Sequence, residues 1–84
     1  MADVEFRLPK LGMSIVEGTV SEWLVEQGDI VEQGQAMLMV EMDKADTELP
    51  APIAGTVVDL AVPAGTTVEV GAVLAVIRPL QIEN

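Results

Sequence analysis

Residues 17–40 read EGTVSEWLVEQGDIVEQGQAMLMV, and residues 54–77 read AGTVVDLAVPAGTTVEVGAVLAVI. At an offset of 37 the two stretches align without a gap and agree at eight of 24 positions. Valines match easily by chance, but three glycines in register do not, and a turn glycine usually supplies a positive φ. The repeat therefore predicts the same order of turns in both halves. The identical pairs are Gly18 with Gly55, Thr19 with Thr56, Val20 with Val57, Val25 with Val62, Gly28 with Gly65, Val31 with Val68, Glu32 with Glu69 and Gly34 with Gly71.

The pattern around the repeat is that of short β-strands. Residues 4–8, VEFRL, alternate apolar and polar side chains with a period of two, which is typical of a strand with one buried face. Seven glycines and five prolines divide the chain into pieces too short for good helices. We expect about seven or eight short strands. Two similar β units bury their apolar faces against each other, so the predicted fold is all-β, a flattened barrel or sandwich with approximate internal two-fold symmetry.

Length and composition limit what this chain can be. Its 84 residues allow one small domain, half of the residues are apolar, and only Phe6 and Trp23 are aromatic. The chain contains no Cys and no His, so it lacks disulfides, the commonest zinc ligands and the commonest pairs of nucleophile and base. Any reactive group must therefore be brought by something else.

The charge balance limits the partners. Fourteen acidic residues against four basic ones give a net charge of -10, which argues against nucleic acid and anionic membranes and favours basic proteins. No apolar run approaches the roughly 20 residues of a membrane span. The N-terminal residues also lack the basic and apolar segments of a secretory signal. We expect a cytoplasmic compartment, or the mitochondrial matrix in a eukaryote.

The segment that we expect to carry the function is residues 41–48, EMDKADTE. The offset of 37 maps residue 44 back onto Arg7 and forward onto Gln81, so this segment corresponds to the place where the N-terminal and C-terminal strands lie together. The symmetry thus predicts a β-hairpin at the end of the molecule away from the chain termini. Pro50 and Pro52 follow, and because proline removes ladder donors the return strand is expected at a sheet edge.

Lys44, at the centre of this predicted turn, is one of only two lysines in the chain. A single amine in an acidic field can be selected by a modifying enzyme. On charge pattern alone the favoured interpretation is a solvated surface charge, in which each ion pair contributes no more than about 1 kcal/mol. Because the acids favour the charged ammonium, a direct nucleophilic role for Lys44 is disfavoured. The nearby carboxylates are those of Glu41, Asp43, Asp46 and Glu48.

A wider set of residues resembles a known family. The run EMDKA at 41–45, followed by ELPAP at 48–52 and Gly55, is similar to the attachment motif of lipoyl domains from the dihydrolipoamide acyltransferase component of 2-oxo acid dehydrogenase complexes. The resemblance extends over nearly the whole chain. Its other elements are LPKLGM at 8–13, EGTV at 17–20, Trp23, EQGD at 26–29, Gly34, Gly65 and Gly71.

The resemblance implies a fold of two four-stranded antiparallel sheets, the barrel-sandwich hybrid, and lipoic acid in amide linkage to Lys44. It implies a lipoyl domain over residues 1–79, with a linker beginning at 80–84, that is a carrier and not an enzyme by itself. The partners would be a lipoate ligase or lipoyl transferase and the decarboxylase/dehydrogenase, acyltransferase and dihydrolipoamide dehydrogenase components of the complex. The isolated domain would be a monomer, and the expected recognition residues are Glu41, Asp43, Ala45, Asp46 and Glu48.

Two other functional classes stay open. A biotin carrier domain of a carboxylase shares this fold but typically has Met on both sides of its target lysine, whereas Asp43 and Ala45 flank Lys44 here. An unmodified barrel-sandwich interaction domain would make Lys44 incidental. Met42 stands where lipoyl motifs more often have Thr or Ser, and the LGM stretch at 11–13 resembles pyruvate or acetoin types more than 2-oxoglutarate types.

The remaining candidates receive structural interpretations. Lys10 lies between Pro9 and Gly12 without acidic neighbours, so we expect a surface role. Trp23 aligns with Leu60 in the repeat, which favours a core position over partner binding. The methionines at 37, 39 and 42 are expected to fill gaps in the core and not to bind a metal. By resemblance, the loop at 12–14 lies beside the hairpin and helps partners to select the domain.

Overall fold

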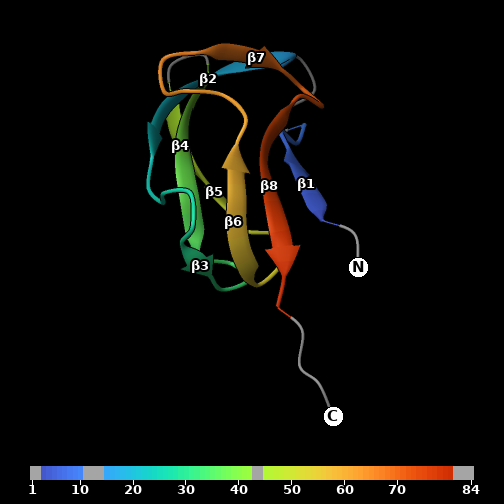
Figure 1. Ribbon diagram of the computed structural model, residues 1–84. Helices are drawn as coiled ribbons and strands as arrows, with labels where there is room; N and C mark the ends of the chain where they lie inside the picture. The colour runs from blue at the N-terminus through green and yellow to red at the C-terminus, as the bar shows by residue number, and fades with distance from the viewer. Residues whose placement is uncertain (1–2, 11–14, 43–44, 81–84) are drawn as a thin grey trace.

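Eight short antiparallel strands form two four-stranded sheets in the part of the chain that the structure describes (Figure 1). The structure is a computed structural model and describes residues 3–10, 15–42 and 45–80. One sheet has the order β1-β8-β6-β3 and the other the order β5-β4-β2-β7, which confirms the predicted fold. The strands are β1 Val4–Arg7, β2 Glu17–Trp23, β3 Ile30–Val31, β4 Ala36–Met42, β5 Ala45–Pro50, β6 Gly55–Leu60, β7 Thr67–Glu69 and β8 Val73–Pro79. Within these residues, no helix is long and apolar enough to cross a membrane.

The internal repeat relates one sheet to the other. It converts β2, β3 and β4 into β6, β7 and β8, so the two sheet orders correspond strand for strand. The main-chain hydrogen bonds repeat as well: Gly28 N donates to Val57 O at 2.7 Å, and Gly65 N donates to Val20 O at 2.6 Å. Each bond joins a turn of one half to an inner strand of the other half. Neither half therefore completes its hydrogen bonding alone.

The offset of 37 does not extend to the outer strands β1 and β5. Thr47 of β5 lies opposite Val40, and Val4 of β1 lies opposite Ile77, the counterpart of Val40. These two strands are therefore related by an offset of 43, which is 47 minus 4. The mapping of residue 44 onto Arg7 is wrong, because a two-residue connection joins β4 to β5 whereas β8 and β1 belong to opposite ends of the chain. The predicted correspondence between the hairpin and the paired terminal strands is confirmed.

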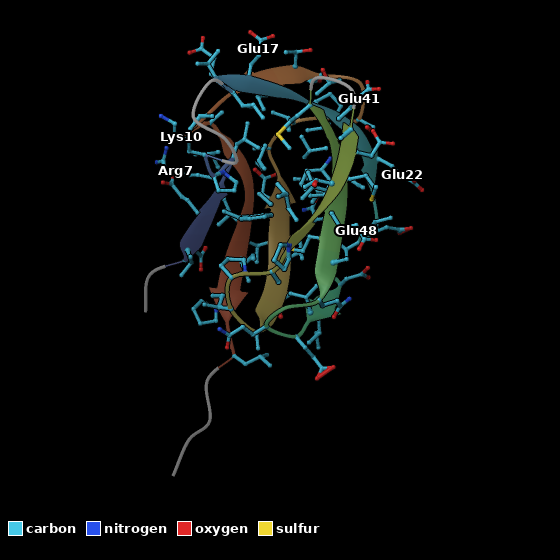
Figure 2. All side chains as sticks on the ribbon, turned by 180° about the vertical axis from the view of Figure 1, so that it is seen from behind. Arg7, Lys10, Glu17, Glu22, Glu41 and Glu48 are labelled. Atoms are coloured by element: carbon cyan, nitrogen blue, oxygen red, sulfur yellow. The ribbon has the colours of Figure 1, made fainter. Side chains whose placement is uncertain are left out.

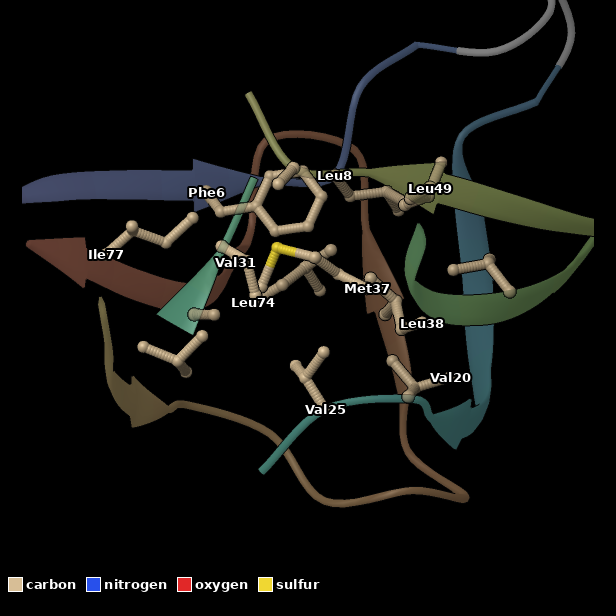
Figure 3. Packing of buried hydrophobic residues seen from close by; sticks show 14 of the residues in the cluster. Phe6, Leu8, Val20, Val25, Val31, Met37, Leu38, Leu49, Leu74 and Ile77 are labelled. Carbon is tan, nitrogen blue, oxygen red and sulfur yellow. The ribbon is translucent and has the colours of Figure 1, made fainter. Parts of the chain in front are cut away.

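The core lies between the two sheets and is built mainly from aliphatic side chains (Figure 3). Met37 and its counterpart Leu74 are both fully buried at its centre. Removing a side chain of this size from water contributes roughly 1.5–3 kcal/mol, so the paired positions hold the sheets together. Among the described residues no polar or charged side chain is buried. The buried residues are Phe6, Leu8, Val20, Val25, Val31, Met37, Leu38, Val40, Met42, Leu49, Ala51, Val57, Leu74, Ala75 and Ile77.

The glycines shared by the two halves have two different physical causes. Gly18 and Gly55 lie within β2 and β6, so the prediction that all three shared pairs mark turns is wrong for this pair. They provide space, since a Cβ built on Gly18 would lie 2.7 Å from Val40 Cγ1. The other two pairs do occupy turns at positive φ, as predicted: Gly28 (97°), Gly65 (93°), Gly34 (89°) and Gly71 (93°).

Trp23 occupies the end of β2 and packs against the core while remaining half-buried. Its Nε1 donates a hydrogen bond to the carbonyl oxygen of Val62 at 2.8 Å. This bond satisfies the indole N–H, which allows the ring to close that side of the core. The predicted core position of Trp23 is confirmed in part, because the residue packs against the core but is only half-buried.

Candidate functional site

The β4–β5 hairpin is the element on which the sequence places Lys44. Met42 pairs with Ala45, which is the pair nearest to the turn in the described chain. Asp43 and Lys44 themselves lie outside the described residues, as do Gln81 and the loop at 12–14. β5 is an edge strand, as Pro50 and Pro52 predicted. Among the residues described, no group of three or more His, Cys, Asp or Glu is arranged to hold a metal ion.

The hairpin lies at the end of the molecule away from the chain termini, as predicted. Glu41, near the turn, is at the top of Figure 2. In Figure 1 β8 ends at the bottom of the molecule and β1 begins on its lower right. Met42 and Ala45, the strand ends that residues 43 and 44 connect, therefore lie far from the start of β1 and the end of β8.

The outer face of the sheet that contains the hairpin is acidic. Glu41 on β4 lies opposite Asp46 on β5, and Glu17 on β2 lies opposite Glu69 on β7. Figure 2 shows Glu22, Glu41 and Glu48 along one side of the molecule, with Arg7 and Lys10 on the other side. The four strands of this sheet contain no Lys or Arg. We call this surface the acidic face, and its exposed carboxylates are those of Glu17, Glu22, Glu41, Asp46, Glu48 and Glu69.

On the other sheet, the pair of residues equivalent to Glu41 and Asp46 carries opposite charges. The counterpart of Glu41 is Arg78, whose Nε lies 3.2 Å from Asp3 Oδ1. Asp3 itself corresponds to Asp46, because both precede equivalent positions of β1 and β5. The same backbone geometry thus holds an ion pair on one sheet and two carboxylates on the other. Like charges directly opposite each other destabilise a sheet, so stability alone does not explain the acidic pair.

The predicted recognition residues that the structure describes lie together. Glu41, Ala45, Asp46 and Glu48 are exposed on the two adjacent strands of the hairpin. Lys10 lies beyond the end of β1 and is exposed, in agreement with a surface role. Met37 and Met42 are buried in the core, as expected. The expectation is wrong for Met39, which is half-buried opposite Glu22 and Glu48, because alternate residues of a strand face opposite sides of the sheet.

Sequence reasoning missed the carboxylates of β2 and β7, which extend the acidic face beyond the hairpin. Glu17 and Glu69 are distant in sequence, and only the antiparallel pairing of β2 with β7 brings them together. The repeat contained a usable signal, because it makes the pair β2 and β7 equivalent to the pair β6 and β3, so either pairing predicts the other. The sequence pattern also indicated only a turn role for Gly18, which lies within β2 against Val40 and Met42.

Comparison with known proteins identifies the relationship. The family described as "Biotin-requiring enzyme", the biotin/lipoyl family, matches residues 4–77. The chain belongs to this family. Its membership implies a covalently attached group of the lipoyl or biotin type, held by a domain that is a carrier and is not catalytic by itself.

Two curated relatives of this biotin/lipoyl domain are acyltransferase components. It is 46% identical over 74 residues to the dihydrolipoyllysine-residue acetyltransferase component of the pyruvate dehydrogenase complex of Corynebacterium glutamicum, covering 88% of this chain and 11% of the relative. It is 42% identical over 73 residues to the succinyltransferase component of the 2-oxoglutarate dehydrogenase complex of Staphylococcus saprophyticus, covering 87% of this chain and 17% of the relative. The chain therefore spans less than a fifth of either relative.

Two solved structures resemble the domain. The lipoyl domain of the 2-oxoglutarate dehydrogenase complex from Azotobacter vinelandii has a TM-score of 0.70 and 27% identity, and the match covers 93% of this chain and 96% of that one. A single-chain, multi-domain long-chain acyl-CoA carboxylase has a TM-score of 0.79 and 25% identity, over 95% of this chain and 7% of that one. The fold is thus shared by lipoyl and carboxylase proteins, and the acyltransferase relatives place this chain with the lipoyl domains.

Proposed function

We propose that Lys44 carries lipoic acid in amide linkage and that this domain presents the lipoyl group to the active sites of a 2-oxo acid dehydrogenase complex. The observation that carries the proposal is the closure of the β4–β5 hairpin by the pair Met42 and Ala45, which leaves only Asp43 and Lys44 between two hydrogen-bonded strands. A β-hairpin limits where its connecting residues can lie, so a lysine at this place is well suited to selection by an enzyme. Its primary amine can form the required amide.

The protein supplies presentation, and the attached group supplies the chemistry that the chain lacks. This chain contains no Cys, so it has no sulfur capable of thiol–disulfide exchange. When bound, a lipoyl group provides a dithiolane that accepts an acyl group and electrons on a long flexible arm. The rigid sheets fix the base of that arm, and tethering raises its effective concentration at successive active sites.

The proposed partners follow from the carrier role. They are a lipoate ligase or lipoyl transferase and the decarboxylase/dehydrogenase, acyltransferase and dihydrolipoamide dehydrogenase components, in the cytoplasm or mitochondrial matrix. We propose that the isolated domain is monomeric and that the complex is of the pyruvate or acetoin type. The acetyltransferase relative from C. glutamicum supports the pyruvate assignment, and the succinyltransferase relative is the competing candidate.

A biotin carrier is the second candidate function, because a carboxylase shares the fold with a high TM-score. The flanking residues Asp43 and Ala45 oppose it. The test is expression of the domain in cells with active lipoylation and biotinylation pathways, followed by intact-mass measurement and mapping of the modified peptide. We expect one lipoyl group on the peptide that contains Lys44. A biotinylated protein would support the carboxylase assignment, and an unmodified one would favour an interaction domain.

The acidic face is expected to contribute to recognition more than to stability. In a variant with Asp46→Asn and Glu48→Gln, the free energy of unfolding should change by less than about 0.5 kcal/mol, because exposed like charges contribute little or repel. Reductive acylation by the decarboxylase component should slow, most clearly at low salt, where charge steering is least screened. The measurement is the initial rate of acylation as a function of ionic strength.

The internal symmetry provides a matched control for this variant. Asp3 and Glu5 occupy the equivalent positions on the other sheet, so Asp3→Asn with Glu5→Gln makes the same change in net charge away from the hairpin. Both residues pair with arginines, Asp3 with Arg78 and Glu5 with Arg7. We expect this control to keep its acylation rate. Equal slowing of both variants would assign the effect to net charge and contradict a role for the acidic face.

A further inference from the structure

Gly18 is buried in the middle of the sheet that carries the hairpin, and its backbone conformation does not require glycine. It lies in β2, and it is absent from the residues with positive φ. What it lacks is space for a side chain. A Cβ at this position would lie 2.7 Å from Val40 Cγ1 and 3.1 Å from Met42 Cγ.

Both contacts are made with residues near the end of β4, close to the hairpin turn. Val40 is fully buried and β-branched, so its methyl group has little freedom to move aside. Met42 is only 8% exposed, and its Sδ would be 3.7 Å from the same Cβ. The side chain of Met42 therefore occupies the room that the missing side chain of Gly18 leaves. This contact holds the end of β4 against β2.

The corresponding place in the other half is built differently. There a Cβ on Gly55 would meet the main chain of Arg78 and the side chain of Ile77. The residue that corresponds to Met42 is Pro79, the end of β8. In both halves the glycine leaves room for an equivalent side chain, Val40 or Ile77. Gly55 also permits close approach of the Arg78 main chain, whereas Gly18 also permits the seating of the Met42 side chain directly before residue 43. This difference places the contact between Gly18 and Met42 at the hairpin end of the molecule.

We propose that Gly18 is a positioning residue for the modification of Lys44. This inference rests on the proposed function, since it assumes that Lys44 is the modified residue. A methyl group on Gly18 must displace Val40 and Met42, and Met42 is paired with Ala45, so the displacement passes to both strands that lead into residues 43 and 44. Protein cores do not absorb such overlap without a shift of the backbone or a strained rotamer.

The experiment compares modification rates among folded apo-domains. Gly18→Ala should lower the initial rate of lipoylation by a purified lipoate ligase on the order of tenfold, because small misplacements of a reacting group are costly. Adding Val40→Ala removes the methyl group that the new Cβ overlaps. The double variant should recover most of the parent rate, and Val40→Ala alone should stay near it. The parent and these three variants form a double-mutant cycle.

A matched control separates positioning from loss of stability. Ile77→Val alters the buried counterpart of Val40 on the other sheet and should cost roughly 0.5–1.5 kcal/mol without slowing modification. Circular dichroism sets a temperature at which every variant is folded. Amide chemical shifts of the described residues around the turn, Glu41, Met42, Ala45 and Asp46, should move in Gly18→Ala and return toward the parent values in the double variant.

The outcomes distinguish this inference from the proposed function. A parent domain that accepts no lipoyl group on Lys44 removes the proposed function and, with it, the basis of the inference. A parent that is modified normally while Gly18→Ala matches its rate overturns the inference alone. A slow Gly18→Ala that Val40→Ala fails to rescue, or an equally slow Ile77→Val, also overturns it, because the defect would then reflect general destabilisation.

Discussion

Lys44→Arg is expected to give a folded domain that carries no lipoyl group. Arginine keeps the positive charge and a similar length, so the electrostatics of the hairpin should be nearly unchanged. Its guanidinium does not replace the primary amine in forming the amide linkage. Intact-mass measurement after expression with an active lipoylation pathway should show a single unmodified species, and reductive acylation by the decarboxylase component should be lost completely.

Lys10 provides the matched control, because it is the other lysine in the chain. It is exposed, so accessibility alone would make it a substrate. It follows β1, outside the acidic hairpin, and we expect Lys10→Arg to be lipoylated as fully as the parent. A lipoyl group found on the Lys44→Arg protein would refute the assignment of the site. Loss of modification in Lys10→Arg would show that the enzyme modifies Lys10 or needs this residue for docking.

The sequence predicted the fold because the repeat carries information about pairing as well as about strands. Gly28 and Gly65 mark equivalent turns, and the hydrogen bonds that they donate connect the two halves. Buried positions such as Met37 and Leu74 could be matched in the same way before any strand order was known. Two copies of one pattern constrain each other more strongly than either copy alone.

The failures arise where the two copies are not subject to the same physical constraint. Gly18 and Gly55 match in sequence and each lies against the equivalent side chain, Val40 or Ile77, but the remaining space is filled by the Met42 side chain in one half and by the Arg78 main chain in the other. A one-dimensional pattern does not distinguish a glycine needed for its φ from one needed for its missing side chain. The shift from an offset of 37 to 43 has a similar origin, because connectivity differs at the hairpin and at the chain ends.

The acidic face required the structure for a different reason. Its hairpin carboxylates were visible as a local cluster, but Glu17 and Glu69 become neighbours only through strand pairing. The contrast with the pair formed by Arg78 and Asp3 also depends on register, since Glu41 and Asp46 occupy the equivalent places. Charge composition gave the sign of the surface, and topology determined which sheet carries it.

Exchanging Asp43 and Lys44 is expected to abolish or nearly abolish lipoylation of a domain that still folds. The exchange keeps composition, net charge and local acidity, and it moves the amine one residue closer to Met42. Along a strand, a shift of one residue turns a side chain to the opposite face, so position in a hairpin determines direction. Both residues are charged and connect the paired strand ends Met42 and Ala45, which is why we expect the fold to survive.

A second variant tests the neighbours of the lysine at a fixed position. Asp43→Met with Ala45→Met leaves Lys44 in place and supplies the flanking methionines typical of biotin carriers, so it should gain some biotinylation. Both proteins are measured by intact mass after expression with both modification pathways, with circular dichroism as the control for folding. If the folded exchange variant were lipoylated as fully as the parent, exposure of an amine would be sufficient. The hairpin could then no longer explain why Lys44 is selected, because an amine displaced by one residue would serve equally well.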